Sequence, residues 1–234
     1  MDREHVRLWT SKKAAEIPST LWPDDFFFKE LPSLSQVLDV GCGGGRLALH
    51  LAQLGHHVIA VDLSLDAVDQ GRRAALRQRV SERCQFYQGT ATALGMLART
   101  FDAVVIQAVL TTVSDPSDRR NILAEVMSVL KPSGFLYLAE FAQTWHRRDY
   151  RDRYLQNEPT TGECGLFIVH GDDGSETYRA KHFSHREIVE LILESGFYLS
   201  AFKHANFSTR SGNIIDGFQI IARPDPTHEG EPQL

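Results

Sequence analysis

The sequence has few cysteines, no long apolar run and no excess of basic residues. Cysteine occurs at positions 42, 84 and 164 only, an odd number without the spacing of a metal site, so we expect free thiols in a reducing compartment rather than a disulfide framework. No apolar run approaches the eighteen or so residues of a membrane span. The first residues are charged and lack the apolar stretch of a signal peptide. These absences predict a cytoplasmic protein without a membrane partner.

The charge balance is slightly acidic. The chain has 25 basic and 30 acidic side chains, a formal net charge of −5. Because no basic excess neutralises a phosphate backbone, nucleic acid is a disfavoured partner. Apolar residues make up 42% of the 234 residues, which is typical of a globular chain. The length predicts a single domain over residues 1–224 and a disordered tail over 225–234, where proline, glycine and acidic residues gather.

Short apolar runs alternate with amphipathic ones along the first 141 residues. Continuous apolar runs of this kind are typical of strands buried on both faces of a parallel sheet, and they occupy 37–40, 58–62, 85–87, 103–106 and 135–138. The segments between them predict helices at 47–54, 64–80, 93–98 and 115–130. Strand, helix, strand in repeating order indicates a doubly wound α/β sandwich.

This alternation ends after Phe141. Residues 142–183 form an insertion of mixed polarity, and we expect a helix and a hairpin that act as a lid or acceptor-binding element. A capping box at 184–187 predicts a helix to about 195. The apolar runs 197–207 and 217–222 follow, and the loop between them is too short for a helical crossover, so the two strands are expected to be antiparallel.

The most informative stretch is the glycine-rich turn at 41–45, which joins a buried strand directly to a helix. Glycine permits positive φ and close approach of the backbone to a ligand, and the helix N-terminus offers free N–H groups. Asp62 ends the second strand, at the spacing of an acid that accepts hydrogen bonds from ribose hydroxyls. The alternative is structural: the glycines serve the turn alone, and Asp62 caps the next helix.

Two residues argue against a dinucleotide at this turn. The third glycine of the dinucleotide fingerprint is replaced by Arg46. Asp39, two residues before the first glycine, is unfavourable for a pyrophosphate but suits a ligand with an ammonium group and a sulfonium. A nicotinamide-dependent oxidoreductase is therefore a disfavoured alternative.

At this point the sequence resembles a family. The stretch VLDVGCGGGRLALHLAQLGHHVIAVDLS resembles the first two motifs of the class I S-adenosylmethionine-dependent methyltransferases. FDAVVIQAVLTTV and LAEVMSVLKPSGFLYLAEF resemble the motifs of the fourth and fifth strands. The resemblance runs from about residue 31 to 141 and more weakly to the last strands. It implies a Rossmann-like, mainly parallel seven-stranded sheet with the last strand antiparallel, and S-adenosyl-L-methionine as cofactor.

The resemblance also implies roles for individual residues. Asp39 would lie near the methionine amino group, Asp62 would hold the ribose hydroxyls and Leu63 would pack on the adenine. The other implied cofactor contacts are Gly41, Cys42, Gly43, Thr90, Ala91, Gln107 and Leu110. Many members have an acid after the third strand for the adenine amino group, whereas this chain has Gln88-Gly89-Thr90-Ala91. A backbone group or the Thr90 hydroxyl is expected to replace that contact.

Methyl transfer is an in-line displacement, so a base is needed only when the acceptor must lose a proton. We expect His146 as that base, at the start of the insertion, and Glu140 as a second catalytic candidate at the end of the fifth strand. Trp145, Tyr150, Tyr154 and His170 are expected to contact the acceptor. The alternative for the aromatic residues is that they pack the insertion onto the sheet. No metal is expected.

Together these features predict a methyltransferase, monomeric or homodimeric, that acts on the oxygen or nitrogen of a small-molecule acceptor. Three alternatives remain: a non-catalytic or partner-dependent protein that binds the cofactor, a protein methyltransferase with an open groove, and the oxidoreductase. Because one fold supports many chemistries, the sequence does not identify the acceptor.

Overall fold

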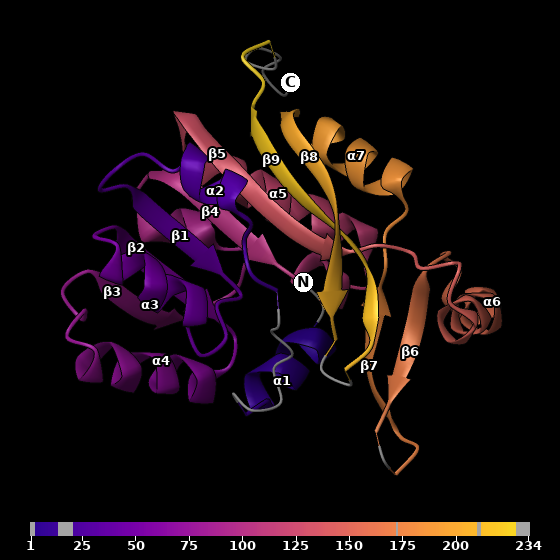
Figure 1. Ribbon diagram of the computed structural model, residues 1–234. Helices are drawn as coiled ribbons and strands as arrows, with labels where there is room; N and C mark the ends of the chain where they lie inside the picture. The colour runs from indigo at the N-terminus through magenta and orange to yellow at the C-terminus, as the bar shows by residue number, and fades with distance from the viewer. Residues whose placement is uncertain (1–2, 14–20, 172, 210–211, 228–234) are drawn as a thin grey trace.

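The computed structural model describes residues 3–13, 21–171, 173–209 and 212–227. Its centre is a seven-stranded sheet in the order β3-β2-β1-β4-β5-β9-β8 (Figure 1). The strands are β1 (Gln36–Val40), β2 (His57–Asp62), β3 (Cys84–Gln88), β4 (Phe101–Gln107), β5 (Leu130–Phe141), β8 (Phe197–Ser208) and β9 (Ile214–Pro224). This confirms the predicted fold class and the position of each strand.

The first five strands of the sheet are parallel, and β9 runs antiparallel between β5 and β8. Val40 at the end of β1 pairs with Val61 of β2 and with Ile106 of β4. The carboxyl ends of these three strands are therefore in line, and the loops that follow them meet at one edge of the sheet.

The helices of the sandwich are α3 (Arg46–Gln53), α4 (Leu65–Arg77), α5 (Pro116–Val129) and α7 (His185–Glu194). Ser64 caps α4, since its side chain accepts from the Ala67 N–H, and the expected capping box of Ser184 and Glu187 is present at α7. Two helix predictions need correction. The helix expected to reach residue 80 ends at Arg77, and residues 93–98 contain only the 3₁₀ turn η2 (Leu94–Leu97).

Two hydrophobic cores lie on opposite faces of the sheet. Val37 of β1 packs with Leu47 and Ala48 of α3, while its neighbour Leu38 packs with Ile122 and Val126 of α5. Successive residues of a strand point to opposite faces, so both must be apolar when helices cover both faces. This accounts for the continuous apolar runs of the sequence.

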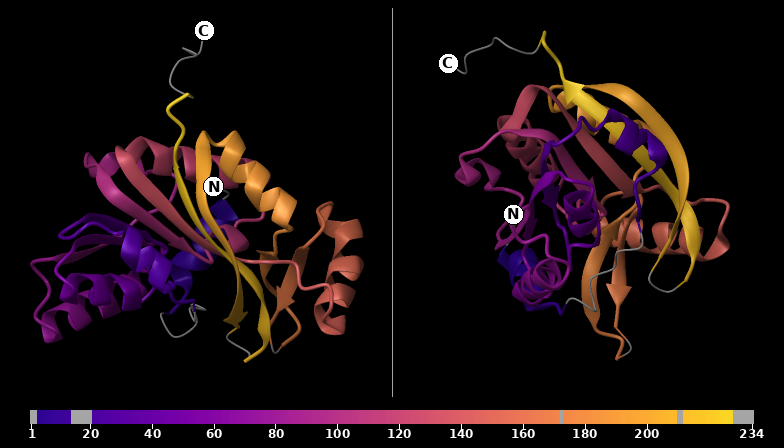
Figure 2. Two further views of the ribbon diagram at one scale, coloured as in Figure 1. Left: turned by 45° about the horizontal axis from the view of Figure 1, so that its top comes forward. Right: turned by 60° about the vertical axis from the view of Figure 1, so that its left-hand side comes forward.

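The insertion folds as predicted, with a helix and a hairpin. It contains α6 (Arg148–Thr161) and the antiparallel pair β6 (Leu166–His170) and β7 (Glu176–Lys181). These elements lie beside the lower ends of β8 and β9 and extend beyond the main sheet (Figure 2). Their position places β7 near the edge of the sheet where β1, β2 and β4 end.

The N-terminal segment contains two helices that the sequence did not predict, α1 (Arg3–Ser11) and α2 (Asp25–Glu30). Phe27 of α2 is fully buried, with its ring 4.7 Å from that of Tyr137. α1 bridges two distant parts of the chain. Trp9 lies edge-on to Tyr178 of β7 at 5.6 Å, and the Lys12 carbonyl accepts from the Ser64 hydroxyl at 2.6 Å.

The tail expected to be disordered at 225–234 lies outside the described residues from 228 onward. Within the described ranges, no helix combines the length and apolar character needed to traverse a bilayer.

Candidate functional site

A pocket opens at the carboxyl edge of the sheet. Its volume is about 680 Å³ when the open mouth is included. The sheet and its loops provide most of the wall, and α1 provides the remainder. The lining residues are His5, Trp9, Val40, Gly41, Val61, Asp62, Leu63, Gly89, Ala91, Gln107, Ala108, Val109 and Thr112. Five of the predicted cofactor residues are therefore brought together here: Gly41, Asp62, Leu63, Ala91 and Gln107.

The backbone at Gly41 requires glycine for two reasons. Its φ is +70°, in the left-handed region, and a Cβ there would lie 2.3 Å from the Cγ2 atom of Val109. The Gly41 N–H also donates to the Val61 carbonyl at 2.8 Å. The turn is thus packed closely between β2 and the loop after β4, and Gly41 lines the pocket with its backbone.

Asp62 connects the glycine turn to the next helix. Its carboxylate accepts from the N–H of Gly43 at 2.8 Å and from the N–H of Ser64 at 2.9 Å. Burial raises the pKa of this carboxyl, against the lowering effect of these backbone hydrogen bonds. The alternative role for Asp62, as the N-cap of the next helix, is not found, because the N-cap of α4 is Ser64. The Asp62 carboxylate also faces the pocket, where each oxygen has a second lone pair for a ligand.

Asp39 lies behind the pocket wall and is buried. Loss of solvation and the neighbouring charge of Asp62 raise the pKa of its carboxyl to about 7. No basic side chain among the described residues lowers the pKa of either acid. The two carboxyls therefore concentrate negative potential beneath the glycine turn, which favours a positively charged ligand group.

Gln107 and Trp9 each present a polar atom without a partner. The Gln107 Nε2 and the Trp9 Nε1 are buried, and neither donates a hydrogen bond to any described residue. Both residues line the pocket. Buried donors are almost always paired, so two unpaired donors in one pocket indicate that a ligand supplies acceptors there.

The other predicted cofactor residues do not line this pocket. Cys42 and Gly43 line a separate hollow on the other side of the turn, with Trp22 and Arg46. Thr90 hydrogen-bonds to the Thr92 hydroxyl at 3.0 Å, and its neighbours Gly89 and Ala91 line the pocket instead.

Leu110 is fully buried beside the pocket, in the turn η3 (Leu110–Thr112), and Glu140 holds this turn in place. The Glu140 carboxylate accepts from the N–H groups of Leu110 and Thr111 at 2.9 and 3.0 Å and from the Thr111 hydroxyl at 2.7 Å. Burial raises its pKa to about 7. These contacts position the wall formed by Val109 and Thr112, and the Glu140 side chain itself does not line the pocket.

The remaining candidates lie away from the pocket. The His146 side chain is 69% exposed, and its Nδ1 is 3.4 Å from Asp216. The Trp145 Nε1 donates to Gln143, and His170 ends β6 with an exposed side chain.

Tyr150 and Tyr154 belong to the core of the insertion. Both rings pack near Phe167, and the Tyr154 hydroxyl is 2.7 Å from the Nδ1 of His182. Burial lowers the pKa of His182 to about 3, so this imidazole is neutral. These contacts match the packing alternative for the two tyrosines, and contact with an acceptor remains a prediction for them.

Neither His5 nor Trp9 is among the site residues predicted from the sequence. They stand four residues apart on α1 and so share one face of the helix. No motif marks them, because their position depends on how a segment about thirty residues before β1 folds over the sheet. The amphipathic spacing of α1 was the one local signal that predicts a buried face.

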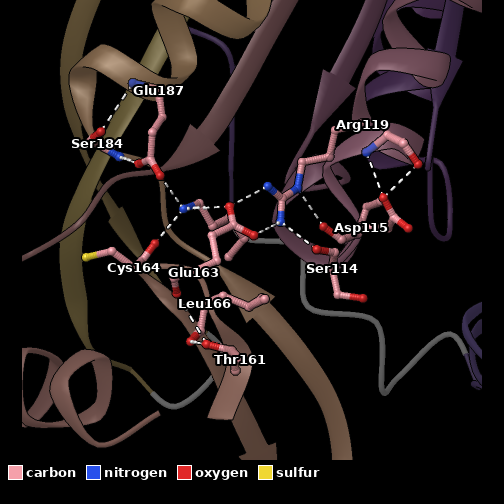
Figure 3. A network of polar contacts seen from close by, with 12 residues as sticks. Ser114, Asp115, Arg119, Thr161, Glu163, Cys164, Leu166, Ser184 and Glu187 are labelled. Carbon is pink, nitrogen blue, oxygen red and sulfur yellow. Dashed lines mark hydrogen bonds and ion pairs between the residues drawn. The ribbon is translucent and has the colours of Figure 1, made fainter. Parts of the chain in front are cut away.

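A buried polar network joins the insertion to the pocket wall (Figure 3). Lys181 of β7 is fully buried and pairs with Glu163 at 2.9 Å and with Glu187 at 2.6 Å. Arg119 of α5 binds the other side of Glu163 with two nitrogens, at 2.7 and 3.1 Å. It also donates to the Val113 carbonyl, directly after η3. The network therefore fixes the insertion and η3 relative to each other.

Comparison with known proteins identifies the family. The sequence profile described as a methyltransferase domain matches residues 37–134. A solved S-adenosylmethionine-dependent methyltransferase from Methanosarcina mazei superposes with a TM-score of 0.81 and 35% identity, covering 88% of this chain and 99% of that one. The chain belongs to the class I S-adenosylmethionine-dependent methyltransferases.

Curated relatives of this methyltransferase differ in acceptor. The tRNA 5-carboxymethoxyuridine methyltransferase of Escherichia coli K12 is 38% identical over 121 residues, which are 50% of this chain and 45% of that protein. The ubiquinone/menaquinone biosynthesis C-methyltransferase UbiE of Ruegeria is 28% identical over 209 residues, or 86% and 80%. The chain thus spans about half the length of the first of these relatives, and the family does not fix the acceptor.

The residues of the pocket fit S-adenosylmethionine, the cofactor of the family. Gly41 lines the pocket and has no side chain, so its backbone forms part of the pocket wall. Asp39 and Asp62 supply negative potential for a ligand that carries an ammonium and a sulfonium, and two buried donors lack acceptors. Because the chain belongs to this family, the cofactor is S-adenosylmethionine rather than a nicotinamide dinucleotide.

Proposed function

We propose that this methyltransferase transfers a methyl group from S-adenosylmethionine to an oxygen or nitrogen of a small-molecule acceptor. The observation that carries the proposal is the pocket at the carboxyl edge, where Gly41, Asp62 and Gln107 converge under α1. When bound, the cofactor supplies an electrophilic methyl group.

Different residues of the chain bind different parts of the cofactor. Asp62 accepts hydrogen bonds from ribose hydroxyls, and Leu63 and Ala91 provide apolar contacts for the adenine. Asp39 supports the ammonium group through the field beneath the turn. Gly41 keeps the backbone close to the ligand. These roles follow the family resemblance, and they are supported by the presence of Gly41, Asp62, Leu63 and Ala91 in the pocket lining.

The roof of the pocket supports a small acceptor. Trp9 of α1 covers the pocket and packs against Tyr178 of β7, so the wall and roof together enclose the space. The net charge of −5 disfavours a polyanionic acceptor such as tRNA. A confined pocket under a weakly acidic surface suits a small molecule better than a nucleic acid or a protein chain.

Radiolabelled transfer to fractionated acceptors tests the proposal. The protein is incubated with methyl-tritiated S-adenosylmethionine and, separately, with a small-molecule extract, total tRNA or total protein. We expect label in the small-molecule fraction only. Label in tRNA or in protein would overturn the small-acceptor assignment. Binding of S-adenosylhomocysteine by calorimetry without transfer to any fraction would favour the non-catalytic alternative.

A further inference from the structure

A second hollow adjoins the cofactor pocket. This hollow, the α1–β7 groove, lies between the N-terminal helix and β7, the second strand of the insertion hairpin. His5 and Thr112 line both the pocket and the groove. The two residues therefore stand at the junction of the two spaces, where an acceptor in the groove would meet a methyl donor in the pocket.

The α1–β7 groove is polar, in contrast to the mainly apolar pocket. Its charged side chains are Glu4, Arg7, Glu176 and Arg179, and its other hydroxyl side chains include Ser11 and Thr177. Glu176 and Arg179 pair with each other at 3.0 Å on β7. A groove with both signs of charge and several hydroxyls suits a small polar acceptor rather than a lipid.

The helix α1 fixes His5 at the junction. Trp9, four residues on, is buried in the roof with its ring centroid 6.2 Å from that of His5 and 5.6 Å from that of Tyr178. The Lys12 carbonyl at the end of α1 is bound to Ser64. The carboxyl-terminal end of the helix is thus held in place, and His5 lines both the pocket and the groove.

His5 is also the suitable base by chemistry. Among the described residues that line the two hollows, it is the one histidine, and histidine is the side chain that exchanges a proton near neutral pH. The charged groups that face this region are Glu4 and Arg7 of α1, Asp62 of β2, and Glu176 and Arg179 of β7.

We propose that His5 accepts the proton released when a hydroxyl or amine of the acceptor, lying in the α1–β7 groove, is methylated. The proposal rests on the proposed function. The bond formed joins the acceptor atom to the methyl carbon, and the bond broken joins that carbon to sulfur. The electron pair remains on sulfur, and the proton passes from the acceptor atom to a ring nitrogen of His5. Trp9 and Gln107 both line the cofactor pocket, where their unpaired donors are available to acceptor atoms of the bound ligand.

A titration of the histidine rings by NMR tests the position of His5 without knowledge of the acceptor. The protein is saturated with S-adenosylhomocysteine, which is neutral at sulfur, or with sinefungin, which carries an amine at the corresponding place. His5→Gln assigns the signal. We expect the midpoint of the His5 titration to lie at least about 0.5 pH units lower with sinefungin, because a nearby cation disfavours the imidazolium.

The outcomes separate this proposal from the proposed function. The exposed His146, which lies away from the pocket, provides the control signal, and this signal should not differ between the two complexes. Equal midpoints for His5 in the two saturated complexes would overturn its placement at the methyl group. If neither compound binds, the proposed function itself fails.

Kinetics with the labelled small-molecule fraction provide the second test. His5→Gln should lower the transfer rate at least 100-fold at neutral pH and abolish the acid limb of the pH–rate profile, with affinity for S-adenosylhomocysteine retained within about threefold. His146→Gln, the matched variant, should retain the acid limb. Loss of the limb in His146→Gln but not in His5→Gln would overturn the proposal and support the sequence-based choice of His146.

Discussion

The carboxyl groups beneath the glycine turn and those in the insertion differ in their partners and in the direction of their pKa shifts. Beneath the turn, the pKa values of Asp39 and Asp62 are raised, and backbone N–H groups are the groups that oppose the effect of burial. In the insertion, Glu163 contacts both Arg119 and Lys181, and the pKa of this carboxyl is lowered despite burial. The first region holds two acids whose pKa values no described basic side chain lowers, and the second holds charge neutralised within the chain.

This difference in pairing distinguishes a ligand-binding site from a network that only stabilises the fold. Burial of an unpaired carboxylate costs free energy, and a fold retains such a group where a ligand compensates it. A buried ion pair with full hydrogen bonding needs no ligand. The comparison therefore assigns cofactor binding to the acids of the turn, and it assigns the placement of β7 and η3 to Arg119, Glu163 and Lys181.

The largest effect is expected when the insertion network is broken. Lys181→Met removes the fully buried cation shared by the half-buried Glu163 and Glu187, and it also removes the donor to the Cys164 carbonyl. The free energy of unfolding should fall by about 3 kcal/mol. Urea unfolding followed by circular dichroism measures it. The matched variant Arg186→Ala removes a solvent-exposed pair with Glu190 and should change stability by no more than about 0.5 kcal/mol. Equal losses in both variants would contradict the account.

The next effect concerns the cofactor. Asp62→Asn removes the charge but keeps the shape of the side chain, so affinity for S-adenosylhomocysteine should fall about 10- to 100-fold, as expected for loss of charged hydrogen bonds. Calorimetric titration measures the change. Asp69→Asn, at an exposed position paired with Arg72, is the control and should leave the affinity unchanged. An unaltered affinity in Asp62→Asn would show that the ligand does not use this acid.

A smaller effect is expected in the pH dependence of stability. The folded pKa of Asp39, about 7, lies above the ordinary value of 3.8, so the folded state holds a proton that the unfolded state loses between these values. The unfolded state thus binds fewer protons in this window, and stability falls as pH rises from about 4 to about 7. Between pH 8 and pH 6 the protein should gain about 1 kcal/mol relative to Asp39→Asn, measured by urea unfolding at each pH. Parallel pH profiles for the two proteins would contradict the raised pKa.

The sequence was sufficient to predict the turn, the strands and the acids, because each depends on a local pattern. The apolar run before Gly41 and the acid at Asp62 are read directly from spacing and strand context. Even the helix and hairpin of the insertion followed from composition and length. These features supply one wall of the pocket.

The part of the pocket that α1 forms could not be predicted from a local pattern. Trp9 and His5 reach the pocket only because α1 packs between β7 and Ser64, contacts that join residues more than fifty positions apart. His146 follows β5 closely in sequence, but the chain turns away and leaves it exposed beside Asp216. Proximity in sequence to the end of a strand was therefore a poor guide to proximity to the pocket.

The most direct test of the central claim is calorimetric titration of S-adenosylhomocysteine at pH 6.5 in two buffers of different ionisation enthalpy. If uncompensated acids form the site, binding of the ammonium group favours the ionised form of Asp39, so protons are released and the apparent enthalpy depends on the buffer. Asp39→Asn should abolish this dependence. Binding with no proton release in the unmodified protein, or the same release in Asp39→Asn, would contradict the claim that the buried acid beneath the turn recognises the cofactor.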